Sequence, residues 1–433
     1  MMKILTLSAL MFFAPLEVQA LLLSSLPMLL VSALAISGPV NYLALMNYDM
    51  ITVSLLLMTF WIILLMKFSQ FQAHLSKALY TLFLTLSLSL VLSFSTNSII
   101  MFYFFFEWSL LPIFMIIVGW GYQMERFKAS LFMLFYTLFA SLPLLILIVN
   151  NTGALHTSYI YIHACTSAPI GGGALSTIML IGAFLVKFPM FFVHHWLPKA
   201  HVEAPVGGSM ILAGVLLKLG GYGMIRISMF LAPVSVLSKV LIISLVGGGL
   251  LSAVCVSFSD LKVMIAYSSV VHMALIILGI ISVSSWGVNG ALIIMVAHGI
   301  CSSGMFSSAN MMYERTHSRN LAQNKGMLNI SPAMAILWFM LCVANFGGPF
   351  TYNLLGEILL IVNLITLSAP FLMIVASISF FSAAYSLILY ASTQQGSLLN
   401  GSFSMSNINC REMLIVSSHV WPLLLLLSSP SLI

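Results

Sequence analysis

The chain of 433 residues is 61% hydrophobic and only 6% charged, and its formal net charge is +6. Soluble domains contain about 25% charged residues, so this composition excludes a water-soluble globular protein and indicates a chain that lies in lipid. The basic residues are scattered, and no basic stretch indicates a nucleic-acid partner.

Hydrophobic segments begin near residue 3. Lys3, an apolar run and Val18-Gln19-Ala20 resemble a secretory signal, but further apolar segments follow at once, which favours a short first span. About fourteen spans are predicted in all, and each should be a helix because lipid offers backbone groups no other partner. Their approximate cores are 3–16, 20–37, 49–66, 78–96, 98–118, 129–149, 175–197, 206–228, 239–257, 262–283, 288–311, 331–368, 370–391 and 412–430.

The seventh and twelfth segments should be discontinuous. The seventh has Pro189 in its middle, and 331–368 is too long for one crossing and contains Gly347-Gly348-Pro349. Such breaks are tolerated where they line a cavity, although an ordinary proline kink is the alternative for the seventh. Breaks five spans apart predict two repeats of five helices each.

The predicted fold is therefore an all-α membrane protein, with one integral membrane domain over residues 1–433. Its parts are N-terminal helices 1–3 (1–75), a first repeat of helices 4–8 (76–230), a second repeat of helices 9–13 (235–392) and C-terminal helix 14 (410–433).

The loop charges predict the orientation of these spans. Ten lysines and arginines fall in the odd-numbered loops, against three on the N-terminal side and in the even loops. Because basic loops stay on the cytoplasmic or matrix side, we expect the odd loops there and both termini on the opposite side.

Four charged residues lie well inside predicted spans, away from the loops, where a central charge costs about 2.5–3.5 kcal/mol and indicates a functional site. They are Glu107, Lys187, Lys218 and Glu357. Snorkelling is the alternative for the two lysines, and a structural ion pair for Glu107. Burial favours the neutral amine of a lysine and a nearby carboxylate favours the ammonium ion, so a Glu107–Lys187 pair could take up and release a proton.

Histidines extend this row of ionisable groups. His272 and His298 lie near mid-span, where a neutral imidazole can relay a proton. The alternative is a core histidine bonded to serine or backbone. His194, His195 and His201 lie with Lys199 and Glu203 near the inner end of the seventh span, which makes them candidates for an inner mouth. No ligand pattern there predicts a metal.

Three functional classes fit these residues. An ion pump or antiporter would use the buried charges as its path, a haem-bearing redox subunit would use His272 and His298 as axial ligands, and a structural subunit would use neither. Neither a haem-bearing subunit nor a structural subunit needs buried cations, so Lys187 and Lys218 favour the pump or antiporter. The five cysteines show no metal or Fe–S spacing, and no ATP or dinucleotide motif occurs, so we expect no cofactor or metal in this chain.

Several motifs carry a resemblance to a known family. They are HHWLPKAHVEAPVGGSMILAGVLLKLGGYGMIR (194–226), AYSSVVHMAL (266–275), AHGICSSGMF (297–306), YERTHSR (313–319), NLLGE (353–357), FFFEWSLLP and LFYTLFASLPLL. With them the chain closely resembles the chain 4 family of mitochondrial NADH-ubiquinone oxidoreductase, the antiporter-like subunits of respiratory complex I. The likeness extends over nearly the whole chain.

This resemblance implies a fourteen-helix antiporter-like fold with inverted five-helix repeats and broken helices 7 and 12. It implies that Glu107 and Lys187 form the coupled pair, that Lys218 is the central lysine and that Glu357 is the acid of helix 12. His272 and His298 match positions of the polar axis. A glutamate at 357 favours chain 4 over its sister chains, which usually carry lysine there.

The resemblance also implies a setting. NADH, FMN, Fe–S clusters and ubiquinone belong to other subunits, the partners are neighbouring antiporter-like chains and membrane lipids, and the location is the mitochondrial inner membrane with both termini on the intermembrane-space side. Outside complex I, a stand-alone or multisubunit cation/proton antiporter is the alternative. Two departures stand out, because His195 replaces a usually apolar residue and the 150–174 linker differs from the vertebrate form.

Overall fold

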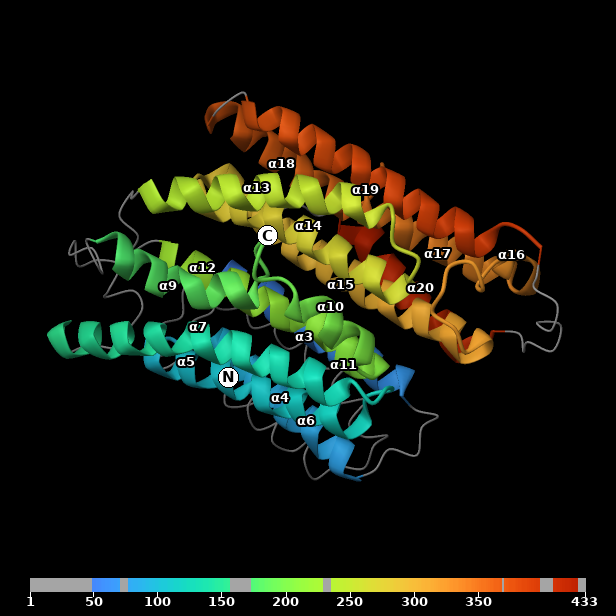
Figure 1. Cartoon of the computed structure of the whole chain (residues 1–433), viewed down its shortest axis with the longest axis horizontal. Coiled ribbons are helices and arrows are strands. Elements are labelled where there is room, and N and C mark those ends of the chain that lie inside the picture. The colour runs from blue at the N-terminus through green and yellow to red at the C-terminus, as the bar shows by residue number, and fades with distance from the viewer. Residues whose placement is uncertain are drawn as a thin grey trace. The chain divides into compact units, whose positions relative to one another are not determined.

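The computed structural model describes residues 49–70, 77–155, 173–228, 235–367, 370–397 and 408–426. This part of the chain is helical and contains no strand beyond one isolated bridge between Asp260 and Asn320 (Figure 1). The all-α prediction is therefore confirmed. The predicted spans 3–16 and 20–37 and most of the 150–174 linker lie outside the described residues.

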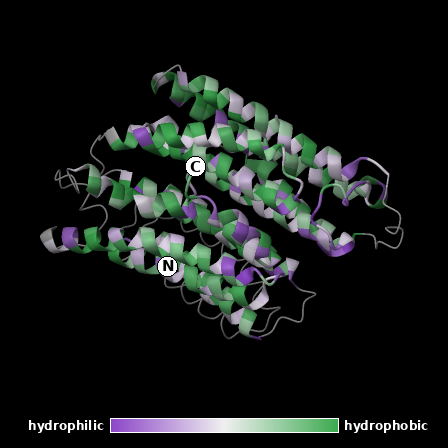
Figure 2. Cartoon of the chain, in the orientation of Figure 1, coloured by the Kyte–Doolittle hydropathy of each residue, from purple (hydrophilic) through white to green (hydrophobic). Residues whose placement is uncertain are grey.

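Within the described ranges, nine helical stretches are long and apolar enough to cross a membrane. They comprise α3 (Met50–Ser69), α4 (Lys77–Ser95), α5 with α6 (Ile99–Trp108 and Leu110–Trp120), α7 (Arg126–Leu155), α11 with η1 and α12 (Val206–Ile211, Leu212–Leu216 and Leu217–Ser228), α13 (Ser235–Cys255), α14 (Leu261–Ile281), α15 (Ser285–Thr316) and α19 (Pro370–Gln394). Hydrophobic residues dominate these helices, and hydrophilic ones gather mainly toward helix ends and connections (Figure 2).

Two further spans are split into halves, as their prolines predict. The seventh consists of α9 (Ala174–Lys187) and α10 (Trp196–Glu203), and the twelfth of α17 (Pro332–Asn345) and α18 (Tyr352–Leu367). The second half of the seventh thus continues beyond the predicted end at residue 197. Short α16 (Met327–Ile330) precedes α17, and α20 (Cys410–Leu425) is the last described helix.

Each break holds a phenylalanine in the left-handed backbone region. Phe192 has a φ of 78° and Phe350 a φ of 67°, a conformation that costs a non-glycine residue about 1–2 kcal/mol. Both rings point outward, with exposed fractions of 66% and 77%. Each helix break therefore combines a strained backbone with an exposed phenylalanine ring.

The helices form two compact units. Unit 1 comprises residues Met1–Phe188, Glu203–Val236 and Leu432–Ile433. Its core contains the rings of Phe94, Phe102, Phe184 and Tyr222, whose neighbouring centroids lie 5.3–6.3 Å apart. Gly223 is required there because a Cβ atom would collide with the Phe184 ring.

Unit 2 comprises Pro189–Val202 and Leu237–Ser431, so the helix break that follows Lys187 packs with the second unit. At its centre lies α15, which packs against α14, α17, α18 and α20. Arg315 of α15 and Glu412 of α20 form an ion pair of 2.5 Å between side chains that are 7% and 6% exposed. This pair fixes the C-terminal helix to the central one.

Candidate functional site

Lys187 is a buried cation at the last residue of α9. Its Nζ donates to the Phe106 carbonyl oxygen at 2.6 Å and to Ser109 Oγ at 3.3 Å, and it lies 3.4 Å from the centroid of the Phe106 ring. The negative end of the α9 dipole also favours a cation at this position. The ammonium group is therefore held by neutral groups.

Glu107 lies one residue beyond Phe106, on α5. Both carboxylate oxygens are buried. The carboxylate lies within electrostatic range of Lys187 and of Ser141 on α7, without a direct ion pair to Lys187 in the described structure. The two groups that the sequence paired are thus neighbours in unit 1.

Lys218, the third charge of unit 1, is fully buried. Its Nζ donates to the Ala213 carbonyl at 2.6 Å. That carbonyl belongs to the π-helical turn η1 (Leu212–Leu216), and such turns often mark functional sites because they disturb the regular bonding of the helix. The sequence carries no signal from which we could have predicted this turn.

In unit 2, His272 of α14 and His298 of α15 lie in contact. Their ring centroids are 5.1 Å apart, the ring planes are inclined by 38°, and both side chains are buried. The Ser269 and Ser303 hydroxyls on the same two helices donate to carbonyls of their own helices. The two histidines are therefore each other's aromatic neighbours.

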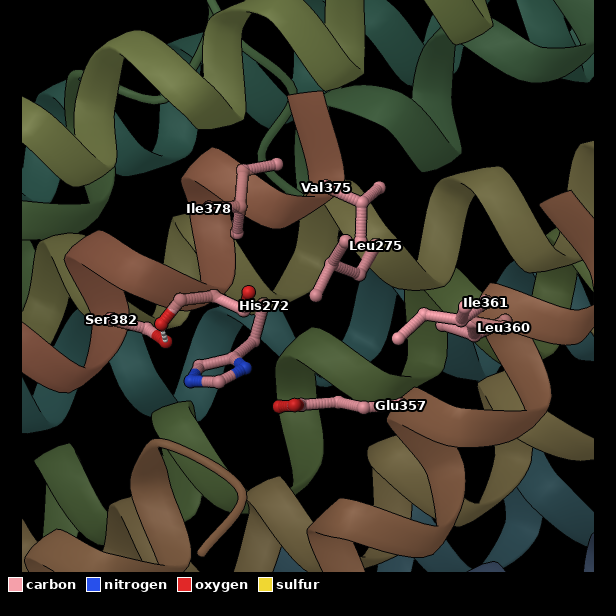
Figure 3. A pocket seen from close by; sticks show the side chains of 9 residues that line it. His272, Leu275, Glu357, Leu360, Ile361, Val375, Ile378 and Ser382 are labelled. Carbon is pink, nitrogen blue, oxygen red and sulfur yellow. Dashed lines mark hydrogen bonds between the residues drawn. The ribbon is translucent and has the colours of Figure 1, made fainter. Parts of the chain in front are cut away.

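Glu357 of α18 faces a small cavity that His272 also lines (Figure 3). The cavity has a volume of about 20 Å³, which is enough for one water molecule. Ser379 and Ser382 of α19 supply hydroxyl groups to the wall. In Figure 3 the imidazole lies between Ser382 and the Glu357 carboxylate, so a water here would find several polar partners.

The helix break also lies close to Glu357. Gly347 has a φ of 67°, and a Cβ atom built on it would lie only 2.5 Å from Glu357 Oε2. Only glycine leaves room for the carboxylate at this point. The break thus positions the acidic group as well as interrupting the helix.

The predicted inner-mouth residues divide between the two units. His194 is buried in unit 2, stacks on Phe191 at 5.7 Å and meets the Tyr267 ring edge-on, while exposed His195 lies 4.4 Å from it between centroids. His201 stacks on Phe306 of α15 at 4.5 Å.

The two charged inner-mouth residues behave differently. Lys199 is exposed. Glu203 belongs to unit 1, where its Oε2 accepts the Gln123 N–H at 3.1 Å. No group of three or more potential metal ligands occurs within the described ranges.

Sequence reasoning missed the serines that accompany the charges: Ser109, Ser141, Ser379 and Ser382. Serine is common in membrane helices, where its hydroxyl usually bonds to its own helix, and these four do so. Without a distinctive spacing, such residues become visible only once the helices are packed.

Comparison with known proteins decides the family. Residues 96–383, more than half of the chain, match the family model "NADH:quinone oxidoreductase/Mrp antiporter, TM". The chain is 45% identical over 399 residues to NADH-ubiquinone oxidoreductase chain 4 of Ceratitis capitata, covering 90% of this chain and 88% of that one. The chain belongs to the NADH-ubiquinone oxidoreductase chain 4 family. The chain 4 protein of Aedes aegypti is 47% identical over 327 residues, covering 75% and 73% of the two chains.

Solved structures agree on the fold of this chain 4 family member. A chain of respiratory complex I from Thermus thermophilus superposes with a TM-score of 0.85 at 23% identity, covering 98% of this chain and 93% of that one. A chain of the Mrp complex from Dietzia sp. reaches 0.81 at 17% identity, covering 99% and 90%. The antiporter-like fold with discontinuous helices 7 and 12 is thereby confirmed.

Proposed function

We propose that the chain is a membrane-arm subunit of respiratory complex I and carries protons through two buried clusters. Glu107, Lys187 and Lys218 form the cluster of unit 1, and His272, His298 and Glu357 that of unit 2. One observation carries the proposal: Lys187 and Lys218 are buried in membrane helices, and each donates at 2.6 Å to a backbone carbonyl. Charges buried in membrane helices are costly and mark functional sites by default.

In unit 1, the separation between Glu107 and Lys187 supplies the switch. When the carboxylate approaches, it stabilises the ammonium ion, and when it withdraws, burial favours the neutral amine. A shift of one pKa unit corresponds to about 1.4 kcal/mol, so a small movement can turn a proton acceptor into a donor. Lys187 then releases its proton, and Lys218 is the next carrier.

In unit 2, the cavity supplies the route. A water beside Glu357 can pass a proton between the carboxylate and His272, and the imidazole can exchange it with His298 through its two nitrogens. Ser379 and Ser382 line the cavity, and their hydroxyl oxygens can accept a hydrogen bond from this water. At one end of this route, Gly347 leaves the space that the Glu357 carboxylate occupies.

The histidine geometry disfavours the haem alternative. Two imidazoles that held a haem would need room for its iron between their ligating nitrogens. The centroids of His272 and His298 are only 5.1 Å apart. Purified chain should therefore show no Soret band. From the chain 4 family we propose that NADH, FMN, Fe–S and ubiquinone chemistry lies in other subunits.

Within the complex, we propose that the chain lies beside other antiporter-like subunits in the mitochondrial inner membrane, surrounded elsewhere by lipid. Large hydrophobic side chains are exposed along α7, including Phe135 and Phe139 at 63% and 84%. Such surfaces are compatible only with lipid or with apolar partner helices.

Replacement of the buried charges in the assembled complex tests this function. Lys218→Ala and Glu107→Gln should leave assembly intact but lower coupled quinone reduction and proton transport together, whereas Glu107→Asp should be milder because the charge remains. Lys128→Ala removes an exposed lysine and serves as the matched control. Assembled Lys218→Ala and Glu107→Gln complexes that pump at the normal rate and ratio would refute the proposal.

A further inference from the structure

Asn363 of α18 is a buried polar residue to which the proposed path assigns no role. It lies six residues after Glu357 on the same helix, which is about 9 Å along the axis at 1.5 Å per residue. Its side chain is 1% exposed, and an amide without partners at this depth would be costly. Both polar atoms of the amide have a hydrogen-bond partner, and these partners indicate what the residue does.

The partners of Asn363 belong to the turn that joins α14 to α15. Its Nδ2 donates to Ser282 Oγ at 2.8 Å, and its Oδ1 accepts the Ser284 hydroxyl at 2.5 Å. Ser282 follows the last residue of α14, and Ser284 is the N-cap of α15, where its Oγ accepts the Gly287 N–H at 2.9 Å. One side chain therefore binds the end of one helix and the start of the next. We call Asn363, Ser282 and Ser284 the turn clasp.

The backbone of the turn is shaped to admit the clasp. A Cβ atom on Gly287 would collide with Ser282 Oγ and would lie 2.8 Å from Asn363 Nδ2. Val283, between the two serines, has a φ of 51°, in the left-handed region that costs a non-glycine residue about 1–2 kcal/mol. Such strain persists only where the surrounding structure holds it. The two bonds from Asn363 supply that restraint.

Close contacts continue along α18 toward the proposed proton path. Leu360 fits against two glycines, because a Cβ atom on Gly279 of α14 or Gly290 of α15 would lie only 2.6 or 3.1 Å from Leu360 Cδ2. Gly356 lies so close to α15 that a Cβ atom on it would be 2.5 Å from a side chain of that helix. Leu360 and Glu357 line the same cavity (Figure 3). Tight packing therefore connects the turn clasp to the cavity wall.

A second buried asparagine ties the other end of α18. Asn353 is 1% exposed, and its Nδ2 donates to the Ala344 carbonyl of α17 at 3.0 Å. Because α18 follows a helix break, no continuous helix fixes its place along its own axis. Glu357 lies between the two tethers, four residues after Asn353 and six before Asn363. The two asparagines together restrain the segment that carries the acid.

We propose that Asn363 is a positioning residue for Glu357: the turn clasp fixes α18 against α14 and α15, and thereby sets the distance between the Glu357 carboxylate and the His272 imidazole across the cavity. This inference rests on the function proposed above, in which those two groups exchange a proton through one water. Hydrogen bonds to that water require donor–acceptor distances of about 2.5–3.2 Å. A displacement of α18 by about 1 Å would therefore break the relay.

The test opens the clasp in two ways in the intact complex. Asn363→Leu removes both of its bonds, and Gly287→Ala displaces the clasp while leaving the sequence of α18 unchanged. Both variants should assemble. Their proton transport and coupled quinone reduction should fall together by about tenfold to a hundredfold, the loss expected when a reacting group is misplaced by about 1 Å.

Asn324→Leu is the matched control. Asn324 is a fully buried asparagine of unit 2, and its amide bonds to Thr316, Ser318 and Asn320 at 2.8–3.1 Å. It holds the loop that follows α15, at the opposite end of that helix from the turn clasp. The substitution should lower the melting temperature of the complex without slowing transport by the assembled protein.

Infrared difference spectra supply a readout that a loss of stability alone would not change. The carbonyl band of protonated Glu357 is identified by its loss in Glu357→Gln. It should shift in Asn363→Leu and in Gly287→Ala, because the carboxyl group leaves its hydrogen-bonding position in the cavity. It should stay in place in Asn324→Leu.

The outcomes separate the two proposals. Normal pumping in Glu357→Gln would refute the proton path of unit 2 and the role of Asn363 with it. Impaired Glu357→Gln with parental pumping in Asn363→Leu would refute only the positioning role, and so would slowed pumping with an unshifted carbonyl band. If Asn363→Leu fails to assemble, Ser284→Ala, which removes one bond of the clasp, decides by the same two readouts.

Discussion

Gly347→Ala should displace the Glu357 carboxylate without removing its charge. The residue has a φ of 67°, so the alanine backbone costs about 1–2 kcal/mol, which is small beside the roughly 5–15 kcal/mol that stabilises a typical protein. The new Cβ would lie 2.5 Å from Glu357 Oε2, whereas carbon–oxygen contacts normally measure about 3.3–3.6 Å. The carboxylate must therefore move by about 1 Å.

A displacement of this size can lower the rate of a positioned reaction by about 10²-fold. We expect the variant complex to assemble but to pump protons at a rate reduced by one to two orders of magnitude, measured in reconstituted vesicles with NADH oxidation followed in parallel. Gly249→Ala is the control, since its Cβ would meet its nearest neighbours at 3.6 and 3.7 Å. Parental pumping by Gly347→Ala would show that the break does not position Glu357.

Three further predictions concern stability and orientation. Arg315→Met should cost about 3–5 kcal/mol because it leaves Glu412 buried without its 2.5 Å partner, and replacing both residues by methionine should restore most of the loss in a thermal-inactivation assay. Asn363→Leu removes the bonds of 2.8 and 2.5 Å that join α18 to Ser282 and Ser284, so amide exchange should accelerate across residues 282–287. Tagged termini should be labelled from the side opposite the loop that contains Lys128, and labelling from the same side would contradict the proposed orientation.

The sequence alone predicted those features that follow from the chemistry of single residues. Pro189 and Gly347-Gly348-Pro349 predicted both helix breaks because proline cannot donate to the helix ladder and glycine weakens it. The ionisable residues stood out because charges inside apolar segments are costly. These two signals require no knowledge of how the helices pack.

The contacts of those residues could not be predicted in the same way. Both faces of a membrane helix are apolar, so periodicity does not reveal which face is buried. Lys187 could be placed in a span, but its position at the end of α9 and its bond to the Phe106 carbonyl depend on packing. The π-helical turn before Lys218 and the serines around Glu357 likewise follow from neighbours distant in sequence.

The left-handed phenylalanines at the two helix breaks have a consequence for the proton permeability of the membrane. A glycine at 192 or 350 would adopt these φ angles without steric cost. A broken helix, however, leaves backbone groups that can recruit water from outside the protein, and a file of water would short-circuit a gradient worth about 2.3 kcal/mol per elementary charge per 100 mV. The two exposed rings place hydrocarbon beside the breaks. A glycine that relaxed the backbone would remove this hydrocarbon, so we expect vesicles that contain Phe192→Gly to lose a proton gradient faster than vesicles that contain the parent.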